Sequence, residues 1–206
     1  MAPAEIAAFD VDGTLTSRDC VLPFLVRVAG RARVAAVLAR HAGLLVAASR
    51  DRARRDDVKA ALVAHLLGGR SADAVALEGD GFAQEIVDRW VRPDLVDRLA
   101  WHCGVGHEVV LVTASFAAYA VPLGRHLGAA RVVATELEVD AGGALTGRLI
   151  GANCRGEEKV RRLAALYGDP PALGWAYGDS SDDRPMLARA RHPVQVGSKA
   201  LAGVPA

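Results

Sequence analysis

The sequence predicts an α/β fold in which a parallel sheet is flanked by helices and a long helical segment follows the first strand. Two observations support this prediction. Short, continuous apolar runs that end in small or polar residues recur along the chain, as is typical of parallel strands buried on both faces. Between the first two runs lies a segment rich in Ala, Leu, Val and Arg, which has helical spacing and almost no strand pattern.

The apolar runs are predicted to form the strands of the core. The first run is followed at once by the turn residues Asp12 and Gly13, which indicates a strand that ends in a loop. The predicted strands are Ile6 to Val11, Glu108 to Thr113, Arg131 to Thr135, Gly174 to Tyr177 and Pro193 to Val196. Residues 136–151 are predicted to form a two-stranded ribbon that turns at Ala141 to Gly143.

Helices are predicted between these strands. Ala117 to Leu127 and Glu157 to Tyr167 are apolar at helical spacing, and each ends at a glycine. The long segment after the first strand holds the predicted helices Leu22 to Val28, Arg31 to Leu45, Asp56 to Leu66, Ser71 to Arg89 and Pro93 to Cys103. A crossover between adjacent parallel strands needs only about a dozen residues, so the insertion is expected to be a cap that closes over a site. Residues 1–15 and 104–206 would then form the core, and residues 16–103 the cap.

Composition excludes several classes of protein. With 51% hydrophobic and 24% charged residues and a net charge of +1, the chain resembles a globular protein with no general attraction to nucleic acid. Cys20, Cys103 and Cys154 lie far apart, so neither a zinc site nor a disulfide framework is indicated. The first residues have no positively charged region and no long apolar run, so a secretion signal is not expected, and Ala42 to Ala48, the most apolar stretch, is far shorter than a membrane span. A cytoplasmic location is therefore expected.

The most informative motif is Phe-Asp-Val-Asp-Gly-Thr-Leu at residues 9–15, at the end of the first predicted strand. Asp10 and Asp12 can converge on a hard cation, which leaves a carboxylate oxygen free to attack phosphorus. The second carboxylate is placed to protonate the leaving oxygen and then to activate water. Gly13 lets the backbone approach a phosphoryl group closely. Taken alone, the same string could be an ordinary turn with Asp as a helix cap.

Three further motifs follow strands or begin helices. Thr113-Ala114-Ser115 offers a hydroxyl and backbone N–H groups at a predicted helix N-terminus, which is an anion site. Lys159 lies in the first turn of a predicted helix and could neutralise phosphate charge. The acids from Asp179 to Asp183 suit Mg²⁺. Each motif alone has a simpler explanation as a cap, a solvated side chain or a polar turn, but their joint occurrence favours a single phosphoryl site.

With these motifs in this order, the chain resembles the haloacid dehalogenase (HAD) superfamily, in the subfamily with a helical cap that contains phosphoserine phosphatase. Asp10 to Thr14 matches the first motif, Thr113 the second, Lys159 the third, and Gly178-Asp179 with Asp183 the fourth. The resemblance covers essentially the whole chain. It implies a Rossmann-like core, an inserted all-helical cap of the C1 type and Mg²⁺ as the cofactor.

The resemblance also implies roles for the matching residues. Asp10 would be the nucleophile and a metal ligand, and Asp12 the general acid and base that also offers the metal its backbone carbonyl. The phosphoryl group would be bound by Thr113, Ala114 and Lys159. Asp179 would be a further metal ligand, with Asp183 supporting the waters of the metal. Dehalogenases lack the second acid of the first motif and ion-pumping ATPases carry Thr there, so Asp12 favours phosphoester hydrolysis.

Three residues are candidates for substrate specificity: Asp19, Ser115 and Asp182. Asp19 stands where phosphoserine phosphatases carry a Glu that holds the amino group of the substrate, but a helix N-cap is an alternative role. Asp182 stands where those enzymes carry an Asn that faces the substrate. Both departures weaken an assignment to phosphoserine itself.

The early part of the predicted cap is basic, and three interpretations apply. It can be a solvated helix face, a guide for a polyanionic substrate, or a contact with an anionic lipid surface. The basic residues are Arg27, Arg31, Arg33, Arg40, Arg50, Arg52, Arg54, Arg55 and Lys59.

The leading functional prediction is Mg²⁺-dependent hydrolysis of a small phosphorylated metabolite through an aspartyl-phosphate. The alternatives are a lipid-phosphate phosphatase, a phosphotransferase to an alcohol acceptor and, ranked last, a non-catalytic phosphate-binding module. No nucleic-acid partner is expected, and a membrane surface ranks below a small metabolite. The sequence makes no prediction of the oligomeric state.

Overall fold

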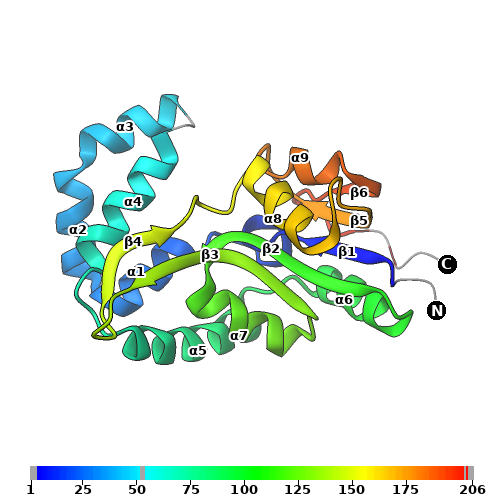
Figure 1. The fold of residues 1–206 in the computed structure, drawn as a ribbon, viewed down its shortest axis with the longest axis horizontal. Helices are drawn as coiled ribbons and strands as arrows, with labels where there is room; N and C mark the ends of the chain where they lie inside the picture. Colours follow the sequence, from blue (N-terminus) through cyan, green and yellow to red (C-terminus); the bar gives the residue numbers. More distant parts are fainter. Residues whose placement is uncertain (1–3, 52–53, 202, 204–206) are drawn as a thin grey trace.

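The computed structural model describes residues 4–51, 54–201 and 203. In these residues a six-stranded sheet has the order β4-β3-β2-β1-β5-β6, with helices on both faces (Figure 1). The strands are β1 (Ile6–Phe9), β2 (Glu108–Phe116), β3 (Arg131–Val139), β4 (Leu145–Ile150), β5 (Leu173–Gly178) and β6 (Ala190–Gln195). The predicted α/β class and Rossmann-like core are therefore confirmed.

The topology brings the predicted motifs to one edge of the sheet. Strand β1 is fully buried and pairs in parallel with β2 on one side and β5 on the other. The carboxyl ends of parallel strands share an edge, so Asp10 after β1 lies beside Thr113 in β2 and Asp179 after β5. The amide of Asp10 extends the pairing by donating to the carbonyl of Tyr177 at 2.9 Å.

Two groups of helices cover the sheet in Figure 1. Helices α5 (Ala72–Arg89), α6 (Pro93–Gly104) and α7 (Ala117–Leu127) lie on one face, and α8 (Glu157–Tyr167) and α9 (Arg184–Leu187) lie on the other. The remaining helices gather near the β4 end of the sheet; they are α1 (Val21–Ala29), α2 (Arg31–Arg40), α3 (Ala42–Arg50) and α4 (Arg55–Leu66).

The single helix predicted for Arg31 to Leu45 is wrong, because the chain bends by 70° between α2 and α3. The amide of His41 at the bend donates to the carbonyls of both Val37 and Leu38, which tightens the end of α2. The bend brings both helices into contact with α4. No single described helix is long and apolar enough to cross a membrane, although α2 and α3 together reach that length and composition as a bent pair.

The contacts of the inserted helices bear on the predicted division into core and cap. Helix α5 packs closely on α7, where a Cβ added at Gly79 would lie 2.0 Å from the carbonyl oxygen of Ala118. Helix α6 contacts β2 and the turn η1 (Val11–Leu15) that follows β1. Of the helices predicted as cap, α5 thus packs on α7 and α6 packs on the sheet itself, and the boundaries at residues 15/16 and 103/104 stay a prediction.

Other differences are smaller. Strand β2 runs three residues beyond the predicted end at Thr113, and β3 continues without a break into the first half of the predicted ribbon. The turn of the ribbon forms as expected, with the Asp140 carboxylate accepting from the amides of Gly142 and Ala144. The short helix α9 was not predicted.

An aromatic cluster packs between the sheet and α6. Phe9 and Tyr177 from adjacent strands stack with their ring centroids 4.2 Å apart, and His102 of α6 meets both rings edge-on. The His102 side chain is fully buried, with Nε2 2.9 Å from the Tyr177 hydroxyl and Nδ1 2.8 Å from Nδ1 of His107. Burial, with the charges of His107 and Arg98, lowers the pKa of His102 to about 3.

This histidine should make the fold sensitive to acid. Because the folded-state pKa of about 3 lies below the ordinary value of 6.5, the unfolded state binds the extra proton between these pH values. The free energy of unfolding should therefore fall as the pH drops, by up to about 1.4 kcal/mol per pH unit from this group. Urea unfolding between pH 4 and 6 should show a flatter dependence for His102→Gln than for the wild type. The exposed control His126→Gln should keep the wild-type slope, and equal slopes for all three proteins would refute the prediction.

Candidate active site

The site begins at the end of β1. The turn η1 that follows this strand passes very close to the residues that follow β5. Gly13 in this turn has φ +82°, a conformation that side-chain-bearing residues rarely adopt. A Cβ added there would lie 2.5 Å from Oδ2 of Asp179. Glycine at this position therefore allows the loops that carry Asp10 and Asp179 to meet.

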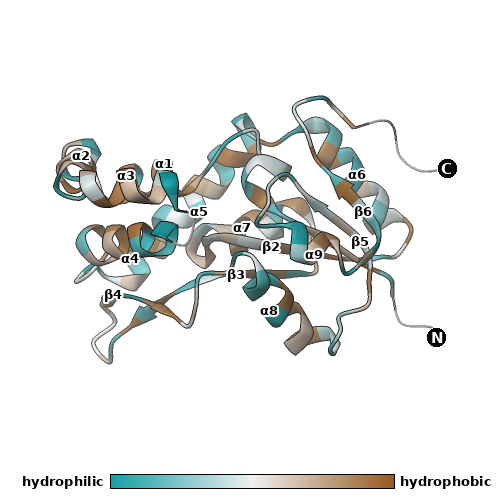
Figure 2. Ribbon diagram, turned by 90° about the horizontal axis from the view of Figure 1, so that it is seen from above, coloured by the Kyte–Doolittle hydropathy of each residue, from teal (hydrophilic) through white to brown (hydrophobic). Residues whose placement is uncertain are grey.

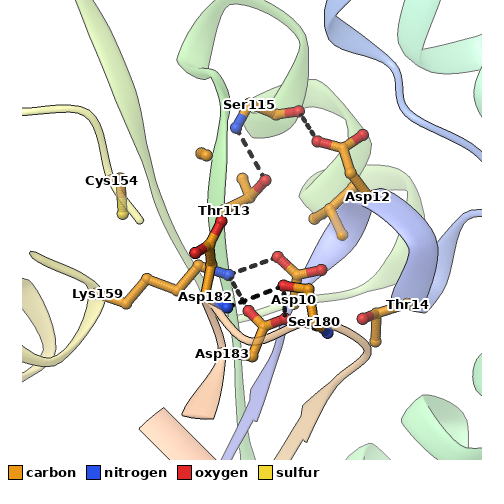
Figure 3. A network of polar contacts seen from close by, with 12 residues as sticks. Asp10, Asp12, Thr14, Thr113, Ser115, Cys154, Lys159, Ser180, Asp182 and Asp183 are labelled. Carbon is orange, nitrogen blue, oxygen red and sulfur yellow. Dashed lines mark hydrogen bonds and ion pairs between the residues drawn. The ribbon is translucent and has the colours of Figure 1, made fainter. Parts of the chain in front are cut away.

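A buried lysine joins two aspartates at the centre of the site (Figure 3). Nζ of Lys159 lies 2.5 Å from Oδ1 of Asp10 and 2.6 Å from Oδ1 of Asp183. Asp10 is 6% exposed, Lys159 2% and Asp183 1%. Burial raises the pKa of Asp10 to about 7, against the opposing charge of Lys159, whose own pKa is raised by the two carboxylates. As predicted, Lys159 lies in the first turn of α8.

Three carboxylates converge at the same point. Ligand oxygens of Asp10, Asp179 and Asp183 all lie within 4.8 Å of one another. Thr14 donates to Asp179 at 3.3 Å, and the Ser180 hydroxyl donates to Asp183 at 2.8 Å, so the acids are held in place. Hard carboxylate oxygens of this kind suit a divalent cation such as Mg²⁺. Lys159 contacts two of these acids, Asp10 and Asp183, and its single charge leaves negative charge for a cation to balance. The donor set therefore fits a divalent metal.

Asp12 points away from this cluster in Figure 3. Its Oδ1 accepts from the backbone amide of Cys20 at 2.8 Å, and its Oδ2 accepts a short hydrogen bond from the Ser115 hydroxyl. The Tyr119 hydroxyl donates to Ser115 at 2.6 Å. Burial raises the pKa of Asp12. The carboxylate thus rests between the loop after η1 and the end of β2, and the predicted metal role of its backbone carbonyl stays a prediction.

The segment Thr113-Ala114-Ser115 belongs to β2, and α7 begins only at Ala117. The residues thus form the end of the strand instead of following it, while the helix begins at Ala117 as predicted. The Thr113 hydroxyl is buried and accepts from the amide of Ser115 at 3.0 Å. The carbonyl of Ala114 accepts from Lys59 and, at 2.9 Å, from the Thr135 hydroxyl. Side chains from α4 and β3 thus hold the end of β2 in place.

Lys59 is the main feature of the site that the sequence interpretation missed. Its side chain is 8% exposed, and Nζ donates to Oδ1 of Asn153 at 2.7 Å and lies 4.6 Å from the ring centroid of Phe116. Burial lowers the pKa of Lys59 to about 8. A signal was present in the sequence, since Lys59 shares helical spacing with the buried Leu62, Val63 and Leu66.

The specificity candidates have partners in the protein. Oδ1 of Asp19 accepts from the amides of Val21 and Leu22 at 3.0 and 3.4 Å at the start of α1, although the N-cap position of this helix is occupied by Cys20. Asp182 lies 3.7 Å from Arg155, which also lies 3.6 Å from Asp56 of α4. The Ser115 hydroxyl donates to the Asp12 carboxylate, as described above. Of these residues, Asp19 and Asp182 line the pocket above Asp10.

That pocket has a volume of about 470 Å³ and connects the buried acids with the helices at the β4 end of the sheet. Asp10, Asp12, Lys159, Asp179 and Asp183 line its base, together with Ala114. Its size is that of a small-molecule site. Of the predicted catalytic, phosphate-binding and metal-binding residues, only Thr113 is not part of the lining.

Comparisons with known proteins agree with this arrangement. A family model described as haloacid dehalogenase-like hydrolase matches residues 7–188. Protein CicA from Caulobacter vibrioides (strain NA1000 / CB15N) is 38% identical over 183 residues, which cover 89% of this chain and 82% of that protein. Phosphoserine phosphatase SerB1 from Mycobacterium tuberculosis (strain ATCC 25618 / H37Rv) is 31% identical over 199 residues, covering 88% of this chain and 61% of that protein.

A solved structure has the same fold. The crystal structure of a protein with unknown function from Bordetella pertussis Tohama I superposes with a TM-score of 0.72 at 25% identity, covering 90% of this chain and 87% of that one. The family match spans most of the chain, and the relative from M. tuberculosis is named as a phosphatase. This chain therefore belongs to the haloacid dehalogenase-like hydrolase family and is a phosphatase.

Proposed function

We propose that the protein is a Mg²⁺-dependent phosphomonoesterase that acts on a small phosphorylated metabolite through an aspartyl-phosphate on Asp10. The observation that carries this proposal is the position of Asp10 at the base of the pocket, with Lys159 2.5 Å away and two further carboxylates within 4.8 Å. A carboxylate held by a cation and open to a pocket has the properties of a nucleophile for phosphorus.

In the first step, a carboxylate oxygen of Asp10 forms a bond to phosphorus while the bond from phosphorus to the leaving oxygen breaks. The protonated carboxyl of Asp12 gives its proton to that oxygen, and the alcohol departs. For this step Asp12 leaves its hydrogen bond with Ser115 and turns toward the pocket that it already lines. Lys159, the Thr113 hydroxyl and the amide of Ala114 hold the phosphoryl oxygens.

In the second step, a water molecule attacks the phosphorus of the aspartyl-phosphate. The Asp12 carboxylate takes the proton of the water, and the bond between phosphorus and the Asp10 oxygen breaks. Inorganic phosphate leaves, and both aspartates return to their starting states. Mg²⁺ bound by Asp10, Asp179 and Asp183, with the Asp12 carbonyl, would supply positive charge to offset that of the phosphoryl group.

Removal of the metal should stop this reaction. Protein dialysed against a chelator and then against metal-free buffer is expected to release phosphate from an aryl phosphate only at the background rate. Added Mg²⁺ should restore turnover, because the three acids then regain their common cation. Phosphate release is measured colorimetrically, and metal content by elemental analysis. Full turnover in protein shown to be free of divalent metal would contradict the proposal.

A further inference from the structure

The pocket above Asp10 has an aliphatic lining on the side away from the acids. The lining side chains on that side are Val21, Leu22, Leu38, Leu45, Val58 and Leu62. They come from α1, α2, α3 and α4, the helices grouped at the β4 end of the molecule in both views (Figures 1 and 2). The helices at this end thus present apolar surface toward a site whose base is strongly polar.

Packing within the core does not account for all of this surface. Leu62 is buried in the main hydrophobic cluster, and Leu38 packs against that cluster. Leu22 and Leu45 do not belong to it, and Leu22 is 42% exposed. Because exposed apolar surface inside a concave site favours an apolar ligand, these leucines are suited to contact the substrate.

Charged residues in the same lining are largely engaged by the protein. Asp19 accepts from two amides at the start of α1, and Asp182 is next to Arg155. The ammonium group of Lys59 donates hydrogen bonds to the carbonyl of Ala114 and to Oδ1 of Asn153. Arg55, at the start of α4, is exposed, so a substrate with a carboxylate is the competing chemistry that an experiment has to separate.

We propose that the leaving group of the substrate is an uncharged and largely apolar alcohol, whose alkyl or aryl part lies against the leucines of α1 to α4. This inference rests on the proposed function, because it assigns the part of the substrate beyond the phosphoryl group. Such a phosphomonoester can be a soluble molecule or a lipid phosphate, and the shared chemistry is an apolar group next to the ester oxygen.

A homologous series of substrates tests the inference. Specificity constants kcat/KM are measured for n-alkyl phosphates from methyl to hexyl, each below its micelle concentration, beside phosphoserine. Each methylene that the pocket removes from water should raise kcat/KM about fourfold until the pocket is filled. Phosphoserine should be a poorer substrate than butyl phosphate. A parallel arm supplies phosphatidic acid in phosphatidylcholine vesicles, so that a lipid source is distinguished from a soluble one.

A variant links the effect to the pocket. Leu45→Ser should reduce the ratio of kcat/KM for hexyl phosphate to that for methyl phosphate, because it removes apolar contact from the lining. Leu45 is only partly buried, so the variant should fold. The matched control Leu77→Ser changes a leucine of α5 that is 74% exposed and does not line the pocket, and it should keep the wild-type ratio.

Three outcomes decide between the alternatives. If kcat/KM rises with alkyl chain length and Leu45→Ser flattens that rise, the leaving group is an apolar alcohol from a soluble source. If turnover is confined to the vesicles, the apolar leaving group comes from a lipid. A flat series without vesicle turnover, or preference for phosphoserine, overturns the inference while Asp10-dependent hydrolysis leaves the proposed function standing. Absence of phosphate release from every substrate overturns the proposed function as well.

Discussion

Asp10→Asn is expected to abolish phosphate release, with kcat falling by about 10⁴-fold or more, while the protein remains folded. Loss of the nucleophile in a covalent mechanism removes the whole reaction path, and in enzymes of that kind it costs up to about 10⁶-fold in kcat. The amide is a weak nucleophile and cannot carry the negative charge that a metal ion and Lys159 would stabilise. The Asp12 carboxylate rests on Ser115 and Cys20, and in the proposed mechanism it transfers protons and does not attack phosphorus.

The same substitution should leave the fold largely intact, because of how the buried charges are arranged. Asp10 and Asp183 share the single ammonium group of Lys159. When Asp10 becomes a neutral amide, Lys159 keeps Asp183 as a partner at 2.6 Å, and one buried charge is removed. Residues that crowd like charges in an active site often reduce stability in favour of function, so the variant should unfold at a denaturant concentration equal to or above that of the wild type.

Activity and urea unfolding are measured on the same preparations. The exposed Asp73→Asn in α5 is the matched control and should retain wild-type activity, because Asp73 is not part of the pocket lining. Near wild-type turnover by Asp10→Asn would refute the assignment of the nucleophile. Loss of activity accompanied by unfolding would show that Asp183 alone does not hold Lys159 and that the fold needs the Asp10 carboxylate.

The parts of the site that lie at strand ends could be predicted from the sequence. Asp10 and Asp179 follow continuous apolar runs, and parallel strands bring such positions to one edge whatever their distance along the chain. Lys159 was predicted correctly in the first turn of its helix. These predictions succeed because the local pattern and the topology of the sheet together determine where the backbone carries each side chain.

The remaining features depend on tertiary packing that local patterns do not determine by themselves. The helical spacing of Lys59 indicates that it faces inward with Leu62 and Leu66, but only the packing of α4 against β4 brings its ammonium group into the site. The bend at His41 lets α2 and α3 both pack on α4, and Gly43 nearby weakens a continuous helix without determining where it breaks. The orientation of Asp12 toward Ser115 depends on a hydrogen bond between residues 103 positions apart.

Lys159→Met should cause the largest loss of stability among the site variants. The lysine is the cation that contacts both Asp10 and Asp183, which are 6% and 1% exposed. Removing one partner of a buried ion pair leaves an uncompensated charge and costs about 3–5 kcal/mol. We therefore expect the free energy of unfolding, measured in urea without divalent metal, to fall by about that amount.

Divalent metal should return part of this stability to the variant, which separates an electrostatic effect from a packing effect. A cation bound by Asp10, Asp179 and Asp183 compensates the same carboxylates that Lys159 neutralises, and a ligand that binds only the folded state stabilises it. Mg²⁺ should therefore stabilise Lys159→Met more than it stabilises Lys199→Met, a control at an exposed lysine near the C-terminus. Lys159→Arg keeps the charge and should lose less stability than Lys159→Met. If Met and Arg at this position were equally destabilising and Mg²⁺ helped neither, the loss would come from packing, and the charge of Lys159 would not be what holds the acids of the site together.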